Sequence, residues 1–211
     1  TWQAAPPPSS WHSEKHHLDG PTPAWSLRPS PPQPRAAGVA ADTCLRCWNQ
    51  GTDPVGTIVE TYLWSRGRLT LPQEAPIRFH PRCQRGPSDL PGGPEYWPAM
   101  LALMTDAVSG QPVGVHRTYL RPDATAKAPV TVHGGTTLKA KMILGTWGVI
   151  RLTPDDDISR ALGIAEGIEN ALTAAQTIGW GPVWAAGTSG CIAKFPLLHG
   201  IETLSIFADA D

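Results

Sequence analysis

The chain has 211 residues, of which 41% are hydrophobic, and its formal net charge at pH 7 is −1. This length predicts one ordinary domain and part of a second, and no apolar stretch approaches the ~18 residues that a membrane span requires. We therefore expect no membrane partner. The sequence opens without the basic flank and apolar run of a secretory signal, so its four cysteines are expected to be reduced thiols in a cytoplasmic protein.

The charge is divided between two parts of the chain. Up to Ile150 there are 14 Lys and Arg against 10 Asp and Glu, whereas from Arg151 onward there are 3 against 8. A mildly basic module followed by an acidic one is compatible with a surface that binds the phosphate backbone of nucleic acid beside a metal site. Chance asymmetry of solvated surfaces explains the same numbers equally well.

The first part of the chain lacks the pattern of a folded core. Nine of the 23 prolines precede Ala36, in a stretch rich in Ser and His with no apolar periodicity. This composition predicts a disordered leader over residues 1–40. Because the sequence begins with Thr1, we expect a truncated upstream end.

The next part, residues 41–157, is expected to be an α+β module. One helix is expected over residues 41–49 behind Asp42 or Thr43 as a cap, and a second over residues 57–65. Gly67 is expected to end the second helix. Strand-like runs follow at residues 77–80, 100–106, 113–119 and 141–144. The turn-rich segment between the middle two predicts a hairpin, and the four runs predict a mixed, mostly antiparallel sheet.

The pattern changes to alternating strand and helix in residues 158–211. Strands are expected at residues 162–165, 182–186 and 203–208, and helices at residues 168–177 and 191–197. This alternation predicts the first half of a parallel α/β sheet. The fold class is therefore α/β, with an α+β module upstream of an incomplete parallel domain.

Carboxylates follow two of the expected parallel strands. Glu166 comes after one strand and is followed by Gly167, and Asp209 and Asp211 come after another. Carboxyl ends of parallel strands meet at one edge of a sheet, and gathered carboxylates there can hold Mg²⁺. Acids at strand ends also cap the helix that follows, and this alternative remains open.

Three cysteines and a histidine have the spacing of a zinc site. Cys44 and Cys47 form one pair, and His80 and Cys83 form another, which together would suit tetrahedral Zn²⁺. However, the first pair lies in the amphipathic helix expected over residues 41–49. We therefore predict buried thiols and no zinc.

A resemblance to a known family is carried by residues 164–172, 183–190 and 206–211. These segments are similar to the first half of a Toprim domain, the catalytic fold shared by bacterial-type primases and topoisomerases. Further segments resemble the domain that precedes Toprim in phage- and plasmid-borne primases, at residues 62–67, 77–81, 114–120 and 139–145. Together they cover roughly residues 42–211.

The resemblance implies a role for several residues. Glu166 would be the catalytic glutamate, and Asp209 and Asp211 would bind Mg²⁺, with Mn²⁺ as an alternative ion. Three basic residues and the residues of one turn would bind nucleic acid or nucleotide, namely Arg117, Lys139, Lys141, Gly187, Thr188 and Ser189. A solvated strand-edge charge or a plain β–α turn is equally compatible with these last residues.

The reaction implied is Mg²⁺-dependent synthesis of RNA primers by a DNA primase of a phage or other mobile element. Its partners would be a single-stranded DNA template, nucleoside triphosphates and a replicative helicase. Because the sequence stops at Asp211, inside the expected site, we expect a fragment of the parent enzyme. The alternatives are a non-catalytic nucleic-acid-binding or replication assembly module, and a Toprim nuclease or topoisomerase relative.

Overall fold

The structure, a computed structural model, describes residues 39–208 and side chains from Asp42 onward. Most of the expected leader, and both Asp209 and Asp211, therefore lie outside the described residues. Val39 and Ala40, which we assigned to the leader, instead form the start of helix α1 (Val39–Asn49). The predicted cap at Asp42 or Thr43 is consequently wrong, because both residues lie within the helix.

Four antiparallel strands form the upstream sheet, in the order β1-β2-β3-β6. Their bounds are β1 Ile77–Arg85, β2 Glu95–Thr105, β3 Pro112–Tyr119 and β6 Lys141–Gly145. All three neighbouring pairs are antiparallel, so this sheet is antiparallel throughout and not mixed. The predicted hairpin between β2 and β3 is confirmed, and the Asp106 carboxylate closes its turn by accepting the N–H groups of Val108 and Ser109.

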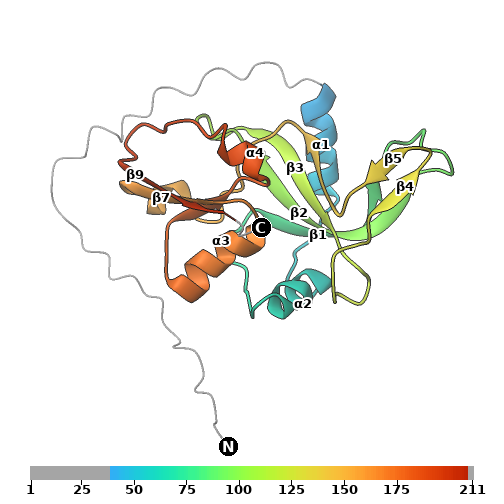
Figure 1. Cartoon of the computed structure of the whole chain (residues 1–211), viewed down its shortest axis with the longest axis horizontal. Coiled ribbons are helices and arrows are strands. Elements are labelled where there is room, and N and C mark those ends of the chain that lie inside the picture. Colours follow the sequence, from blue (N-terminus) through green and yellow to red (C-terminus); the bar gives the residue numbers. More distant parts are fainter. Residues whose placement is uncertain (1–38, 209–211) are drawn as a thin grey trace, which may run out of the picture.

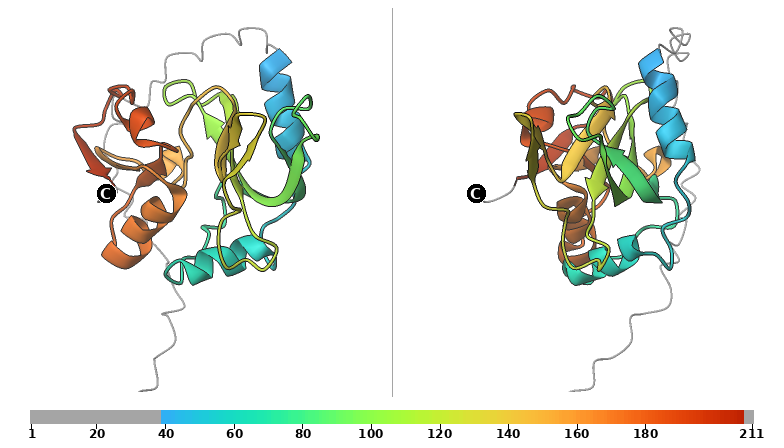
Figure 2. Two further views of the ribbon diagram at one scale, coloured as in Figure 1. Left: turned by 45° about the vertical axis from the view of Figure 1, so that its right-hand side comes forward. Right: turned by 90° about the vertical axis from the view of Figure 1, so that its right-hand side faces the viewer.

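Helices cover both faces of this sheet (Figures 1 and 2). α1 lies on one face, where Cys44 packs in a cluster with Leu101, Val115 and Tyr119. α2 (Ile58–Ser65) contributes Val59, Tyr62 and Leu63 to the larger core on the other face. As expected, α2 begins behind Thr57, whose hydroxyl oxygen accepts the N–H of Val59 at 3.2 Å.

A small hairpin was missed by the sequence analysis, β4 (Thr131–His133) with β5 (Thr136–Leu138). The Arg85 guanidinium, fully buried, anchors it by donating to the Pro129 carbonyl and the Thr131 hydroxyl while pairing with Glu95 at 2.6 Å. Burial opposes ionisation of Glu95, but hydrogen bonds from neighbouring side chains and the charge of Arg85 outweigh it and lower its pKa to about 2.

The downstream part is a three-stranded parallel sheet in the order β8-β7-β9. Its strands are β7 (Ala161–Ala165), β8 (Val183–Ala185) and β9 (Thr203–Phe207). The helices lie close to the predicted positions: α3 spans Ile168–Thr173 and continues as a π-helical turn over Ala174–Ile178, and α4 spans Ser189–Ile192. α4 therefore begins earlier and is shorter than the helix expected over residues 191–197.

The two sheets share one core. Met100 and Ala102 of β2 pack in the same cluster as Ala165 of β7 and Ile168 of α3. Ile150 exchanges two backbone hydrogen bonds with Ala185, which ties the connecting segment to the parallel sheet. The predicted fold class, an α+β module followed by a parallel α/β unit, is confirmed, although the upstream sheet is antiparallel and not mixed. No helix between residues 39 and 208 has the length and apolar character needed to cross a membrane.

Candidate active site

The carboxyl edge of the parallel sheet lies at the junction of the two units. Ala165, the last residue of the central strand β7, is paired with Ala185 of β8 and Phe207 of β9, so all three strands end together. The N–H of Glu166 donates to the Phe207 carbonyl at 3.3 Å. The Trp147 indole, from the segment after β6, donates to the Ala186 carbonyl at 3.0 Å and brings the upstream module to this edge.

Two glutamates three residues apart have different environments at this edge. Glu166 is partly exposed, and within residues 39–208 its carboxylate makes no hydrogen bond or ion pair. Glu169, in the first turn of α3, is instead engaged by Lys127 at 2.8 Å and by the Tyr62 hydroxyl at 2.7 Å. Glu166 is thus available to a ligand, whereas Glu169 is already committed to the protein.

The interactions of Glu169 fix its protonation state. Burial raises its pKa, but the charge of Lys127 and the hydrogen bonds from Lys127 and Tyr62 outweigh burial and lower the pKa to about 2. Burial and the neighbouring carboxylate also raise the pKa of Tyr62 well above its ordinary value. Tyr62 is therefore a neutral hydrogen-bond donor. This argues against Tyr62 as the tyrosine nucleophile that a topoisomerase relative would need.

Positive charge reaches the edge from the antiparallel sheet. The Lys141 ammonium lies near Gly167 and Glu169, because a Cβ placed on Gly167 would be 3.6 Å from Lys141 Nζ and 3.5 Å from Glu169 Oε2. His116, opposite Ile143 in the β3–β6 register, is buried on the same face of the sheet. Burial, followed by the charge of Lys141, lowers the pKa of His116 to about 4, so its ring is neutral at pH 7.

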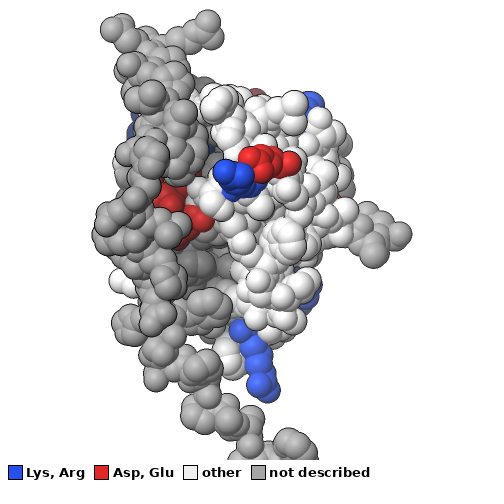
Figure 3. All heavy atoms as spheres, turned by 90° about the vertical axis from the view of Figure 1, so that its left-hand side faces the viewer, with Lys and Arg blue, Asp and Glu red and all other residues white. Residues whose placement is uncertain are grey.

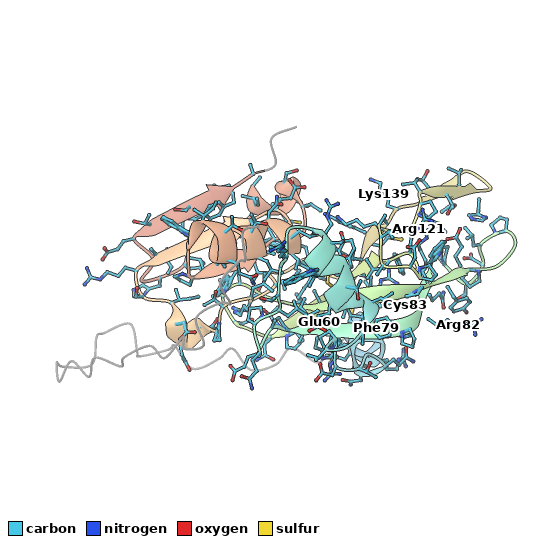
Figure 4. The ribbon with its side chains drawn as sticks, turned by 90° about the horizontal axis from the view of Figure 1, so that it is seen from below. Glu60, Phe79, Arg82, Cys83, Arg121 and Lys139 are labelled. Carbon is cyan, nitrogen blue, oxygen red and sulfur yellow. The ribbon has the colours of Figure 1, made fainter. Side chains whose placement is uncertain are left out.

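Arg117 and Lys141 do not meet. Arg117 pairs with Met142 and Lys141 with Thr118, so the two cations occupy alternate positions and point to opposite faces of the sheet. Arg117 lies on the α1 face, where it donates to the Gln84 carbonyl at 3.1 Å. Lys139 is exposed in the connection between β5 and β6 (Figure 4).

The turn at residues 187–189 follows β8 at the same edge. Gly187 has a φ of +90°, a left-handed conformation that favours glycine. The Thr188 hydroxyl caps α4 by accepting the Cys191 N–H at 3.2 Å. This capping supports the plain-turn interpretation, and phosphate binding by residues 187–189 stays a prediction.

In the part of Figure 3 that is not covered by grey atoms, a few charged side chains lie on a mostly white, uncharged surface. The cations described at this edge come from the junction with the antiparallel sheet: Lys127 pairs with Glu169, and the Lys141 ammonium lies near Gly167. The junction therefore brings positive charge to the sheet edge after which Glu166 follows.

The fit of a metal ion depends on residues beyond β9. Among residues 39–208, no group of three or more His, Cys, Asp or Glu side chains is arranged to hold an ion. Glu166 supplies one carboxylate of the oxygen type that Mg²⁺ prefers. The remaining donors would be Asp209 and Asp211, which lie outside the described residues, so the distance between these acids and Glu166 stays a prediction.

The zinc-like pairs are partly buried thiols. Cys44 and Cys83 are each 2% exposed, as predicted for buried thiols, and the Cys44 thiol donates to the Leu144 carbonyl at 3.1 Å. Cys47 is half-buried and hydrogen-bonded with Cys83. His80 instead contacts the Gln50 side-chain oxygen at 3.3 Å.

Three residues of this site escaped the sequence analysis: Lys127, Glu169 and His116. Glu169 had a usable signal, since an acid in the first turn of the helix expected from residue 168 lies close to the strand end that precedes it. Lys127 had none, because it lies in the loop after β3 and reaches the site only where Ala128 bonds back to Tyr119.

The comparisons with known proteins identify one family. The family described as Domain of unknown function (DUF7146) matches residues 39–148, just over half of the chain, which covers α1 to the end of the antiparallel sheet. No curated protein and no solved structure matches the chain.

Proposed function

The chain belongs to the family described as Domain of unknown function (DUF7146), and since that description assigns no activity, we propose a function from the site itself. We propose that the protein is a primase-type nucleotidyltransferase of the Toprim kind. It would use Mg²⁺ to join ribonucleotides on a single-stranded DNA template. Its reaction would be attack of a ribonucleotide 3′-hydroxyl on the α-phosphate of the next nucleoside triphosphate, with release of pyrophosphate.

One observation carries the proposal: Glu166 directly follows the central strand of a parallel sheet, its carboxylate is uncommitted within residues 39–208, and the ammonium of Lys141 lies near the adjacent Gly167. A structural acid at this position would be expected to pair with a neighbouring cation, as Glu169 does with Lys127. An acid held apart from its neighbours at a strand end, near a cation, is the arrangement that a phosphoryl-transfer site needs.

The roles of the side chains follow from their charges. Glu166 would accept the proton of the attacking hydroxyl or hold an ion, with Asp209 and Asp211 as the principal metal ligands. When bound, Mg²⁺ would neutralise the negative charge that develops on the transferred phosphoryl group. Lys141 would hold phosphate oxygens, and the Glu169–Lys127 pair would keep the start of α3 in place. Neutral His116 would add no charge.

The test is template-dependent ribonucleotide incorporation by the complete gene product, with Mg²⁺ and with chelator. We expect Lys141→Ala to lower incorporation about tenfold to hundredfold and to reduce the salt slope of single-strand binding by about 0.7, the value for one lost phosphate contact. Arg160→Ala, at an exposed pair with Glu202, is the matched control and should change neither. Absence of Mg²⁺-dependent incorporation by the wild-type protein would refute the proposal.

A further inference from the structure

A second candidate site lies on the opposite face of the antiparallel sheet. A groove of about 820 Å³ runs between the carboxyl-terminal half of α1 and the outer part of β1. Its size falls in the range of small-molecule sites. Three arginines and one histidine line its walls, Arg46, Arg82, Arg117 and His80, and no Asp or Glu does.

Arg117 forms the floor of this groove and is only 8% exposed. One of its terminal nitrogens donates to the Gln84 carbonyl, but its Nε is buried without a hydrogen-bond partner in the described structure. Among residues 39–208 no carboxylate pairs with it, whereas Arg85, which is fully buried and also has an unpartnered Nε, pairs with Glu95. A buried guanidinium without an anion leaves a costly unpaired charge, which a bound anion would satisfy.

The rim of the groove offers an aromatic surface beside further cations. Tyr96 is 46% exposed, and the Arg82 guanidinium lies 4.5 Å from its ring centroid. Figure 4 shows Arg82 projecting from β1, next to the buried Cys83. Arg46 is exposed on α1 and donates to the Thr43 hydroxyl. Exposed aromatic rings next to arginines are typical of sites that stack bases of unpaired nucleotides.

We propose that this groove binds a nucleotide unit, with a phosphate at Arg117 and the base at Tyr96. The assignment is independent of the catalytic role of Glu166, because the antiparallel sheet separates the two sites. Either a free nucleoside triphosphate or one nucleotide of a single nucleic-acid strand would present this chemistry. Binding of ATP is therefore compared with binding of a short deoxythymidine oligonucleotide.

The experiment measures dissociation constants by fluorescence anisotropy for the full chain and its variants. We expect Arg117→Met, which keeps the length of the apolar stem, to weaken binding of the nucleotide probe at least tenfold. The double variant Arg46→Ala with Arg82→Ala changes only exposed side chains and should also weaken binding about tenfold. It decides the question if the circular dichroism spectrum shows that Arg117→Met fails to fold.

Two controls change charged residues that do not line the groove. Arg160→Ala, at an exposed pair with Glu202, should bind the probe like the wild type, and so should Glu202→Gln at the same pair. Wild-type affinity in the folded double variant would overturn the groove assignment. Binding of inorganic phosphate without competition by either nucleotide probe would overturn the nucleotide assignment.

A chemical footprint gives a readout at the groove itself. Cys47 lines it, and interaction with the Cys83 thiol, opposed by burial and aided by the charge of Arg117, lowers the pKa of Cys47. Cys47 should therefore react with iodoacetamide faster than the buried thiols of Cys44 and Cys83. Saturating nucleotide should slow its alkylation at least severalfold, as followed by peptide mass spectrometry. An unchanged rate would contradict occupation of this groove.

Discussion

Replacing Glu166 by Gln is expected to lower the rate of primer synthesis about a thousandfold without unfolding the protein. Gln keeps the size and hydrogen-bonding capacity of the side chain but removes the anionic charge and basicity that proton transfer or metal binding requires. Because no described residue bonds to the Glu166 carboxylate, the substitution breaks no interaction within residues 39–208. Ribonucleotide incorporation and thermal unfolding of the same preparation would measure both effects.

The matched control is Glu202→Gln, which changes an exposed glutamate of the same unit, 3.3 Å from Arg160. It should synthesise primers like the wild type. The double variant Asp209→Asn with Asp211→Asn should lose synthesis as Glu166→Gln does, while its affinity for single-stranded DNA is kept or rises at low salt. Normal synthesis by the double variant would remove these acids from the reaction.

Replacing Glu169 by Gln is expected to lower the free energy of unfolding by about 2 kcal/mol, because it leaves Lys127 without its anion in a partly buried site. The amide oxygen can still accept a hydrogen bond from the Tyr62 hydroxyl, so the loss of stability measures mainly the removal of the negative charge. Urea denaturation at pH 7 measures it. Glu202→Gln, at an exposed pair, should change the free energy of unfolding by less than about 0.5 kcal/mol.

The effect of Glu169→Gln should depend on pH in one direction. The pKa of Glu169 is about 2 in the folded protein and ordinarily 4.5, so its stabilisation is complete above pH 4.5 and is lost as the pH falls towards 2. The difference in stability between wild type and variant should therefore shrink between pH 5 and pH 2. A difference that stays constant over this range would show that the carboxylate charge is not what stabilises this junction.

Most of the fold could be predicted from local patterns. The apolar runs at residues 100–106 and 113–119 located β2 and β3, and Thr57 located the start of α2. The β4–β5 hairpin was not predictable in the same way. Its strands are short and largely exposed, and they are held by Arg85 and Glu95, which are distant in sequence. The hairpin is therefore held by tertiary contacts of residues such as Thr131, which a local sequence pattern does not reveal.

The site was predictable only in part. Glu166 could be placed at a sheet edge because the strand pattern before it was clear. The opposite orientations of Arg117 and Lys141 depend on the register between β3 and β6, and a shift of one residue would have placed both differently. Lys127 reaches Glu169 through a loop contact that carries no local periodicity.

The most direct test of the catalytic proposal is a crystal structure of the complete gene product grown with Mn²⁺, which anomalous scattering locates. We expect an ion at the carboxyl edge of the parallel sheet, bound by Asp209 and Asp211, with the Glu166 carboxylate within roughly 10 Å of both. Carboxylates of Glu166 and the two aspartates on opposite faces of the sheet, with no ion between them, would contradict it.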